Sequence, residues 1–270
     1  MTKSVLVTGA SAGIGRATAD LLAAHGWSVT GGSRRGTGGE SSSWTGVHLD
    51  VDDDASVADA VADAAGRNGG RLDALVACAG WGLAGPAEQT SVEDGKAQFE
   101  TNFWGVHRCV AAALPLMRHQ GRGRIVVVGS IGGVIAIPFQ AFYSASKFAL
   151  EGYAEALAWE VAPFGVEVTI VQPGNVRTEF TSARRDVAPP EGEDDPYSER
   201  VAKAISVMER DEQAGASPNA VARTIERVLG ASKPPRRVSV GKPLERAGVV
   251  AKRLLPFSVF EKAAKGALGV

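Results

Sequence analysis

The sequence predicts an α/β protein built as one doubly wound domain, with about seven parallel strands covered by helices on both faces. Short β-branched runs alternate with longer helical patterns, which is the order expected of a parallel sheet wrapped by helices. Several runs are apolar at almost every position, as in strands that are buried on both faces. The length of 270 residues fits one large domain of this kind.

The predicted strands and helices alternate along most of the chain. We expect strands at residues 4–8, 28–32, 46–49, 74–78, 124–128, 167–171 and 237–240. We expect helices near residues 14–25, 55–65, 92–118, 142–162 and 217–229. Because βαβ crossovers are right-handed, these units stack into a doubly wound sheet with its ligand crevice at the carboxyl ends of the strands.

Two segments interrupt the alternation. Residues 178–215 lack strand periodicity and contain Pro189-Pro190 and the acidic run 191–195, so we expect a substrate lid after the sixth strand. A helix near 197–212 is expected within this lid. Residues 244–270 form a C-terminal extension that mixes basic and apolar side chains. That extension could close the pocket, pack on a partner subunit or lie on a membrane surface.

The composition excludes several classes of protein. The 29 basic and 30 acidic residues nearly cancel, which argues against a nucleic-acid partner. The two cysteines, Cys78 and Cys109, lie in apolar runs and are expected to be small buried residues. The sequence carries no disulfide framework, signal peptide or transmembrane stretch of about 18 apolar residues, so we expect a cytoplasmic protein. We expect no metal site.

A glycine-rich turn, Gly9-Ala10-Ser11-Ala12-Gly13-Ile14-Gly15, joins the first strand to the first helix. Its glycines permit a tight turn and a close approach of the backbone to a pyrophosphate at the helix N-terminus. The Gly-x3-Gly-x-Gly spacing differs from the G-x-G-x-x-G pattern, and such a segment can be simply a turn. Its place between an apolar strand and a helix favours nucleotide binding by Gly9, Ser11, Gly13, Ile14 and Gly15.

The end of the second strand indicates which nucleotide is bound. An NAD site typically has an acidic residue there, but this chain has Ser33-Arg34-Arg35. Guanidinium groups match phosphate oxygens, so we expect Arg34, assisted by Ser33 and Arg35, to bind a 2′-phosphate. The alternative is a solvated basic loop. NADP(H) is therefore the preferred cofactor, with NAD(H) possible.

Tyr143 and Lys147 are four residues apart on a predicted helix, so both project from one face. A nearby ammonium favours the phenolate and would lower the pKa of Tyr143 from its ordinary value near 10. Ser130 directly follows the strand 124–128 and is expected at the ligand crevice, where its hydroxyl can donate to a carbonyl oxygen. The alternative for Ser130 is that it only starts a turn.

Two further groups complete the predicted site. Asn102 lies in the middle of a predicted helix, where a satisfied structural asparagine is the ordinary interpretation. The functional interpretation is that Asn102 bends the helix and holds a water that links Lys147 to solvent. The segment 173–178 follows a buried strand and would place Pro173, Gly174, Val176 and Thr178 near the nicotinamide amide or the phosphates.

These motifs together resemble the short-chain dehydrogenase/reductase superfamily, whose fold is a Rossmann domain. The resemblance runs in order from Thr8 to Thr178. It implies that Tyr143 is the general acid and base, and that Lys147 lowers its pKa and holds the nicotinamide ribose. It also implies that Ser130 polarises the carbonyl and that Asn102 anchors a relay water. Asp50-Val51, after the third strand, would contact the adenine.

One motif departs from the family pattern. Members usually have Asn-Asn-Ala-Gly after the fourth strand, where this chain has Ala77-Cys78-Ala79-Gly80. Ala79 and Gly80 still allow the backbone to pass the adenine ribose. The loss of the asparagine hydrogen bonds is expected to change cofactor affinity by at most about 1–2 kcal/mol.

The length, the Phe-x-Thr-Asn-Phe-Trp-Gly string at 99–105 and the Pro-Pro-Arg-Arg-Val strand at 234–238 narrow the resemblance. They look most like the branch that contains 17β-hydroxysteroid dehydrogenases, retinol dehydrogenases and many bacterial ketoreductases. This resemblance implies a homodimer or homotetramer with helices 92–118 and 142–162 at the interface. We expect hydride transfer between NADP(H) and a lipophilic ketone or aldehyde, or the matching secondary alcohol. The alternatives are a non-catalytic NADP(H)-binding regulator and an epimerase or lyase. The expected pocket wall, which could instead be core or subunit contact, contains Ile131, Val134, Ile135, Phe139 and Phe180.

Overall fold

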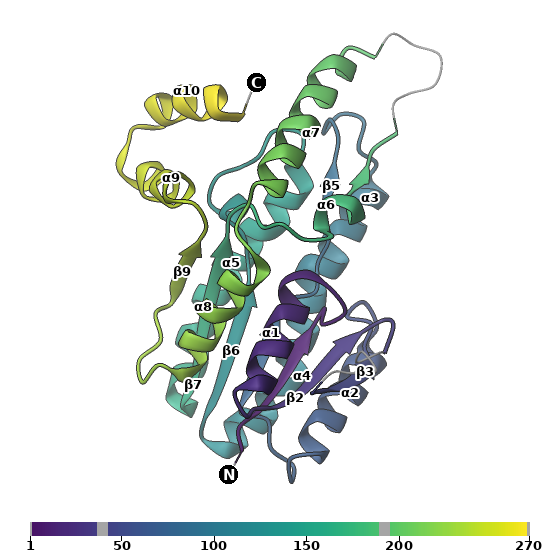
Figure 1. Ribbon diagram of the computed structural model, residues 1–270, viewed down its shortest axis with the longest axis vertical. Coiled ribbons are helices and arrows are strands. Elements are labelled where there is room, and N and C mark those ends of the chain that lie inside the picture. The colour runs from purple at the N-terminus through teal and green to yellow at the C-terminus, as the bar shows by residue number, and fades with distance from the viewer. Residues whose placement is uncertain (1, 37–42, 189–194, 269–270) are drawn as a thin grey trace.

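The computed structural model describes residues 2–36, 43–188 and 195–268. Seven strands form one parallel sheet in the order β3-β2-β1-β4-β6-β7-β9 (Figure 1), which confirms the predicted doubly wound fold. All seven predicted strands are present. They are β1 Ser4–Thr8, β2 Ser28–Ser33, β3 Thr45–His48, β4 Ala74–Ala77, β6 Gly123–Val128, β7 Val166–Pro173 and β9 Arg237–Val240.

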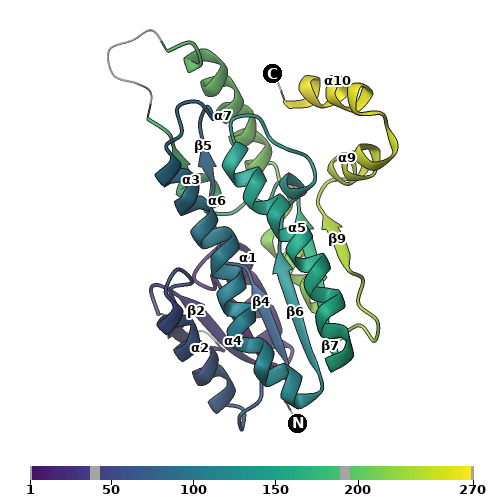
Figure 2. The same cartoon turned by 180° about the vertical axis from the view of Figure 1, so that it is seen from behind.

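Helices cover both faces of the sheet (Figures 1 and 2). One face carries α1 (Gly13–Ala24) and α8 (Pro218–Gly230), and the other carries α2 (Asp54–Gly66), α4 (Gly105–Gln120) and α5 (Ala141–Val161). Within β1, Leu6 belongs to one core while Val5 and Val7 belong to the other, because successive side chains point to opposite faces. The apolar runs therefore reflect burial on both sides.

β1 pairs with both β2 and β4, so the direction of winding reverses between β1 and β4. In such sheets, the crevice outside the carboxyl ends of the strands at this reversal is where ligands bind. The glycine-rich turn leaves β1 at this point and enters α1.

The predicted helix 92–118 consists of three segments. α3 (Val92–Phe99) leads into a π-helical turn, η1 (Glu100–Trp104), which continues as α4. The predicted helical stretch is confirmed, and the i→i+5 bonding of the π turn, which was not predicted, widens the helix around Asn102.

The predicted excursion after β7 contains α6 (Phe180–Ala183), β8 (Arg185–Asp186) and α7 (Ser198–Gln213). α7 confirms the helix expected near 197–212. β8 pairs with β5 (Leu83–Ala84), a small second sheet that was not predicted. Pro189-Pro190 and the acidic run, apart from Asp195, lie outside the described residues.

The shorter elements complete the chain. The 3-10 turns η2 (Ile131–Gly133) and η3 (Ala162–Phe164) flank α5 in the sequence. The C-terminal extension forms α9 (Pro243–Leu254) and α10 (Phe257–Leu268), for which no helices were predicted. Across the described residues, no helix is both long and apolar enough to cross a membrane.

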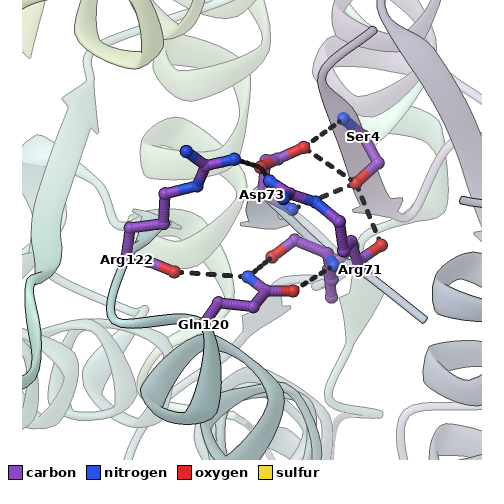
Figure 3. Close-up of polar contacts among 6 residues, drawn as sticks. Ser4, Arg71, Asp73, Gln120 and Arg122 are labelled. Carbon is purple, nitrogen blue, oxygen red and sulfur yellow. Dashed lines mark hydrogen bonds and ion pairs between the residues drawn. The ribbon is translucent and has the colours of Figure 1, made fainter. Parts of the chain in front are cut away.

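A polar network fastens the amino-terminal ends of β1 and β4 (Figure 3). The Asp73 carboxylate accepts hydrogen bonds from the backbone N–H of Ser4 at 2.9 Å and from Arg71 Nη2 at 2.9 Å. The Gln120 side chain bonds both backbone groups of Leu72, at 2.9 and 3.0 Å. The network lies at the end of the sheet away from the ligand crevice.

Candidate active site

A cavity of about 1260 Å³ extends along the carboxyl ends of the strands and is walled by the lid, α9 and α10. It brings together most residues of the predicted site. The predicted residues that line it are Gly9, Ser11, Gly13, Ile14, Gly15, Ser33, Arg34, Arg35, Asp50, Val51, Ala79, Gly80, Ser130, Ile131, Ile135, Tyr143, Lys147, Pro173, Gly174, Val176, Thr178 and Phe180.

Val134 and Phe139 are not among the residues that line this cavity, and their predicted place in the substrate pocket stays a prediction. Phe139 has a positive φ of 59°, an unusual conformation for a bulky residue, and lies with its ring centroid 5.9 Å from the Arg200 guanidinium. Val134 follows the 3-10 turn η2, and its backbone N–H donates to Ile131. Both residues belong to turns that the apolar pattern did not reveal.

Tyr143 and Lys147 are buried on α5 and face the cavity. The Tyr143 ring lies 5.7 Å from the ring of Phe180 on α6, measured between centroids. The Lys147 ammonium lies 5.9 Å from the centroid of the Tyr143 ring and donates to the Val128 carbonyl at 3.0 Å. The end of β6 therefore fixes the lysine beside the phenol.

Burial controls the ionisation of both side chains. It raises the pKa of Tyr143 to about 12, and the Ser130 hydroxyl acts in the lowering direction. It lowers the pKa of Lys147 to about 8. Lys147 is not among the groups that shift this pKa in the structure, so its predicted lowering of the Tyr143 pKa stays a prediction. At pH 7 the phenol therefore holds its proton.

Ser130 lies between the end of β6 and η2. Its hydroxyl accepts a hydrogen bond from the backbone N–H of Gly132 at 2.9 Å, so it does start a turn. It also lines the cavity and acts on Tyr143. The two interpretations of Ser130 are therefore compatible, since one lone pair holds the turn while the O–H remains a donor.

Asn102 is fully buried in the π turn and lies behind the cavity wall. Its Nδ2 donates to the Trp81 carbonyl at 3.0 Å and to Ser146 Oγ at 3.2 Å, while its Oδ1 accepts from the Trp81 N–H at 3.0 Å. It thus ties the loop after β4 to α5, as a structural asparagine would. Its role in holding a relay water stays a prediction.

The turn after β1 has the geometry that its glycines predict. Gly9 and Gly13 have φ values of 68° and 54°, and a Cβ on Gly15 would lie 2.3 Å from the Gly9 carbonyl oxygen. The Thr8 hydroxyl oxygen accepts from the N–H groups of Cys78 and Ala79, both at 2.9 Å. Thr8 therefore holds the end of β4 against the turn, although this chain lacks the family's asparagine.

An anionic group already lies at the N-terminus of α1. Ala12 caps this helix without a side-chain hydrogen bond, and the Gly13 N–H donates to Glu179 Oε2 at 3.1 Å. The carboxylate oxygen takes the place that a phosphate oxygen would occupy at such a terminus. Arg34 and Arg35 are exposed at the end of β2 and line the same cavity, so the residues present fit a dinucleotide.

Several residues of the cavity were not predicted. Gln140, three positions before Tyr143, is 3% exposed, and its Nε2 has no hydrogen-bond partner among the described residues. Glu179 and Glu212 approach from the lid, and Glu212 acts on the pKa of Tyr143 in the raising direction. Only the fold of the lid brings these carboxylates to the cavity, so sequence spacing gave no signal for them.

The sheet is doubly wound, its first crossover is glycine-rich, and a Ser-Tyr-Lys cluster lies at the same crevice. This combination is typical of a nicotinamide-dependent oxidoreductase. A model of the short chain dehydrogenase family matches residues 3–188. The chain therefore belongs to the short-chain dehydrogenase family, whose members use a nicotinamide cofactor.

Characterised and solved relatives align over most of the chain. A 3-ketodihydrosphingosine reductase of Bacteroides thetaiotaomicron is 38% identical over 96% of this chain and 95% of its own length. Retinol dehydrogenase 8 of Bos taurus is 36% identical over 87% of this chain and 80% of its own. The crystal structure of a short-chain dehydrogenase from Streptomyces avermitilis is 33% identical, covers 98% of both chains and has a TM-score of 0.82.

Proposed function

We propose that this chain is an NADP(H)-dependent oxidoreductase that acts on a lipophilic ketone or aldehyde, or on the matching secondary alcohol. The observation that carries the proposal is the meeting of Ser130, Tyr143 and Lys147 in the cavity that also contains the glycine-rich turn and Arg34. One cavity can therefore hold the nucleotide and the carbonyl group together.

The chain's own residues would hold the carbonyl and move the proton. The Ser130 hydroxyl donates to the carbonyl oxygen, and Tyr143, protonated at neutral pH, delivers a proton to that oxygen. The Lys147 ammonium beside the phenol offsets the charge left on Tyr143. When bound, the dinucleotide supplies the hydride.

NADP(H) is the proposed cofactor because of the charges at the end of β2. Arg34 and Arg35 are exposed there, at the position where an NAD site typically has a carboxylate. The glycine-rich turn and the N-terminus of α1 would hold the pyrophosphate. Asp50, Val51, Ala79 and Gly80 would line the adenosine portion, and the segment 173–178 the nicotinamide portion.

The far part of the cavity supports a lipophilic substrate. Beyond Tyr143 it is walled by Ile131, Phe180 and Met208 and then by apolar residues of α9 and α10. The similarity to a 3-ketodihydrosphingosine reductase supports the same class, a ketone on a long hydrocarbon chain. We therefore propose long-chain ketones as the first compounds to test.

The test is a comparison of wild type with Tyr143→Phe, using NADPH consumption with long-chain ketones. We expect Tyr143→Phe to lose at least about 100-fold in kcat, the lower range for general acid catalysis, while NADPH binding is unchanged. Retained activity in Tyr143→Phe would overturn the assignment. NADPH binding without turnover of any carbonyl would favour a regulator, and conversion without net NADPH loss would favour an epimerase or lyase.

The cofactor preference is tested by fluorescence titration with NADPH and NADH. Arg34→Ala should weaken NADPH binding by about 10- to 100-fold, the scale of a charged hydrogen bond, with little change for NADH. Lys3→Ala, which removes a cation stacked on Trp27 at 5.4 Å outside the cavity, is the control. Equal loss for both nucleotides would contradict the 2′-phosphate role.

A further inference from the structure

We propose that α9 and α10, here called the C-terminal helical pair, dock the protein on an anionic phospholipid membrane. The pair lies at the outer edge of the molecule beyond β9 (Figures 1 and 2). The described helices cannot span a bilayer, so the proposed contact lies in the membrane interface.

The first observation is an exposed apolar surface. On α9, Val250 and Leu254 are one helical turn apart and share a face, and the corner between the helices adds further side chains. Apolar residues gathered in this way on a surface mark an interaction site. They are Leu244 (81% exposed), Val250 (55%), Leu254 (76%), Leu255 (43%), Phe257 (66%) and Val259 (53%).

The second observation is the sign of the charge around this surface. Residues 242–268 contain six basic and two acidic residues, in a chain whose formal net charge is −1. The exposed charged side chains between 242 and 262 are all cations: Lys242, Arg246, Arg253 and Lys262. Glu245 instead bonds inward, accepting from Asn175 Nδ2 at 2.9 Å. Cations beside exposed apolar residues complement an anionic lipid surface.

A second copy of the chain fits this surface less well. A two-fold interface places the same patch on both subunits, so Arg246 and Arg253 would face the cations of the other copy. Like charges at such a contact oppose association. The charge pattern therefore favours lipid headgroups.

The pair is a fixed element rather than a loose tail. The Lys252 ammonium lies 4.8 Å from the centroid of the Phe257 ring and 4.9 Å from that of Phe260, which joins α9 to α10. Val249 on α9 and Phe260 on α10 are buried. The outer side chains are consequently held in a defined arrangement.

The apolar surface is continuous with the cavity. Leu244 and Leu255 are exposed and also line the cavity that contains Tyr143. Docking would place the cavity mouth against lipid, so that a lipophilic substrate passes from the bilayer to Tyr143 without crossing water. This entry route rests on the proposed function, whereas membrane docking itself does not.

The test is cosedimentation of the full chain with phosphatidylcholine vesicles, with and without phosphatidylserine, at low and high salt. We expect binding only with phosphatidylserine, and weaker binding at high salt. Leu254→Ser/Phe257→Ser should abolish binding, and Arg246→Gln/Arg253→Gln should weaken it roughly five-fold per cation. Val92→Ser, which changes an apolar residue of similar exposure (64%) on α3, should bind as wild type does.

Wild-type protein that stays in solution, or equal binding by Leu254→Ser/Phe257→Ser and wild type, would overturn the proposal. A lower molar mass of that variant by light scattering, without vesicle binding by wild type, would assign the surface to a second copy. NADPH titration of each variant checks that the fold is intact. Because vesicle binding is measured without turnover, its outcome is independent of the proposed reaction.

Discussion

Tyr143 and Lys147 lie in surroundings that favour the uncharged form of each. The phenol, with its pKa raised to about 12, is a proton donor at pH 7, which suits reduction of a carbonyl. The lysine, with its pKa lowered to about 8, is still mostly charged at pH 7 but close to losing its proton. We therefore expect the proposed reaction to be sensitive to moderately alkaline pH.

We expect the rate of ketone reduction to fall as pH rises through about 8. Burial lowers the pKa of Lys147 from 10.5 to about 8, so its charge is present below that pH and lost above it. Without the cation, the charge left on Tyr143 is no longer offset. A pH profile of kcat/KM checks this, and Lys147→Arg should retain its charge and move the decline to higher pH. An unmoved decline would assign the titration to another group.

Gln140 is predicted to set substrate specificity. Gln140 lines the cavity, and its buried Nε2 has no hydrogen-bond partner among the described residues, so we expect it to turn toward a second polar group on the substrate. Gln140→Met should raise KM by about ten-fold for ketones with a hydroxyl or amino group next to the carbonyl, but not for simple ketones. Thermal unfolding should be unchanged or slightly improved. An equal change for both ketone classes would show a merely structural role.

The start of α6 contacts the site at two places, the N-terminus of α1 and Tyr143. Glu179 reaches the N-terminus of α1, and the next residue, Phe180, packs on Tyr143. The lid carboxylate and a phosphate would compete for the same backbone N–H of Gly13. We therefore expect cofactor binding to be coupled to the position of the lid.

Glu179→Gln should tighten NADPH binding, because it removes a negative charge from the place that a phosphate would take. We expect an improvement of about two- to five-fold, the scale of one helix-terminus charge interaction. Fluorescence titration measures it, with Glu199→Gln on the exposed face of α7 as the control. Weaker binding in Glu179→Gln would mean that the carboxylate supports the turn instead of competing with the ligand.

Residue patterns predicted the strands and helices that can be recognised from a short stretch of sequence alone. The strands were found because both faces are apolar, as Val5, Leu6 and Val7 show. The two-residue strands β5 and β8 are too short to show periodicity, and they pair across about 100 residues of chain. The π turn was missed because its composition does not differ from that of an α-helix.

The site residues, too, could be predicted only where a short stretch of sequence shows a pattern. Gly9 and Gly15 were predictable because the turn needs their backbone freedom and close approach, and Tyr143 and Lys147 because one helical turn separates them. Side chains that approach from distant segments, such as Glu179, carry no spacing signal. The sequence therefore predicted the residues that carry reactive groups better than the residues that form the pocket wall.

The carboxyl and amino ends of the sheet have different roles in the molecule. The carboxyl ends carry the cavity, while Asp73 and its partners fasten the amino ends (Figure 3). Asp73→Asn should lower the free energy of unfolding by about 2–3 kcal/mol, because it leaves a partly buried guanidinium of Arg71 without its counter-charge. Urea unfolding measures this loss, and NADPH affinity should not change.

The matched control is Asp63→Asn, whose ion pair with Arg67 is exposed on α2 and should contribute less than about 0.5 kcal/mol. Equal stability of the two variants would show that the network at the base of the sheet is dispensable. A loss of NADPH affinity in Asp73→Asn would show that the two ends are coupled.

The proposed homo-oligomer also has a surface to test. Trp104 and Phe148 are 48% and 42% exposed, and Trp159 is 68% exposed, on the helices η1 and α5 that were expected at the subunit interface. Trp159→Arg should reduce the molar mass measured by light scattering, because a buried unpaired charge opposes association. An unchanged mass would place the interface elsewhere.

The π turn Glu100–Trp104 preserves the phase of everything that follows it in the helix. Such a turn holds about one residue more than an α-turn and takes it up by winding more widely, so Cys109 and Val110 on α4 still reach the core face. Deleting one residue within the turn would convert it to α-helix and leave the phase of α4 nearly unchanged. Deleting one residue in regular α-helix just after the turn would instead rotate the remainder by about 100° and turn both side chains out of the core.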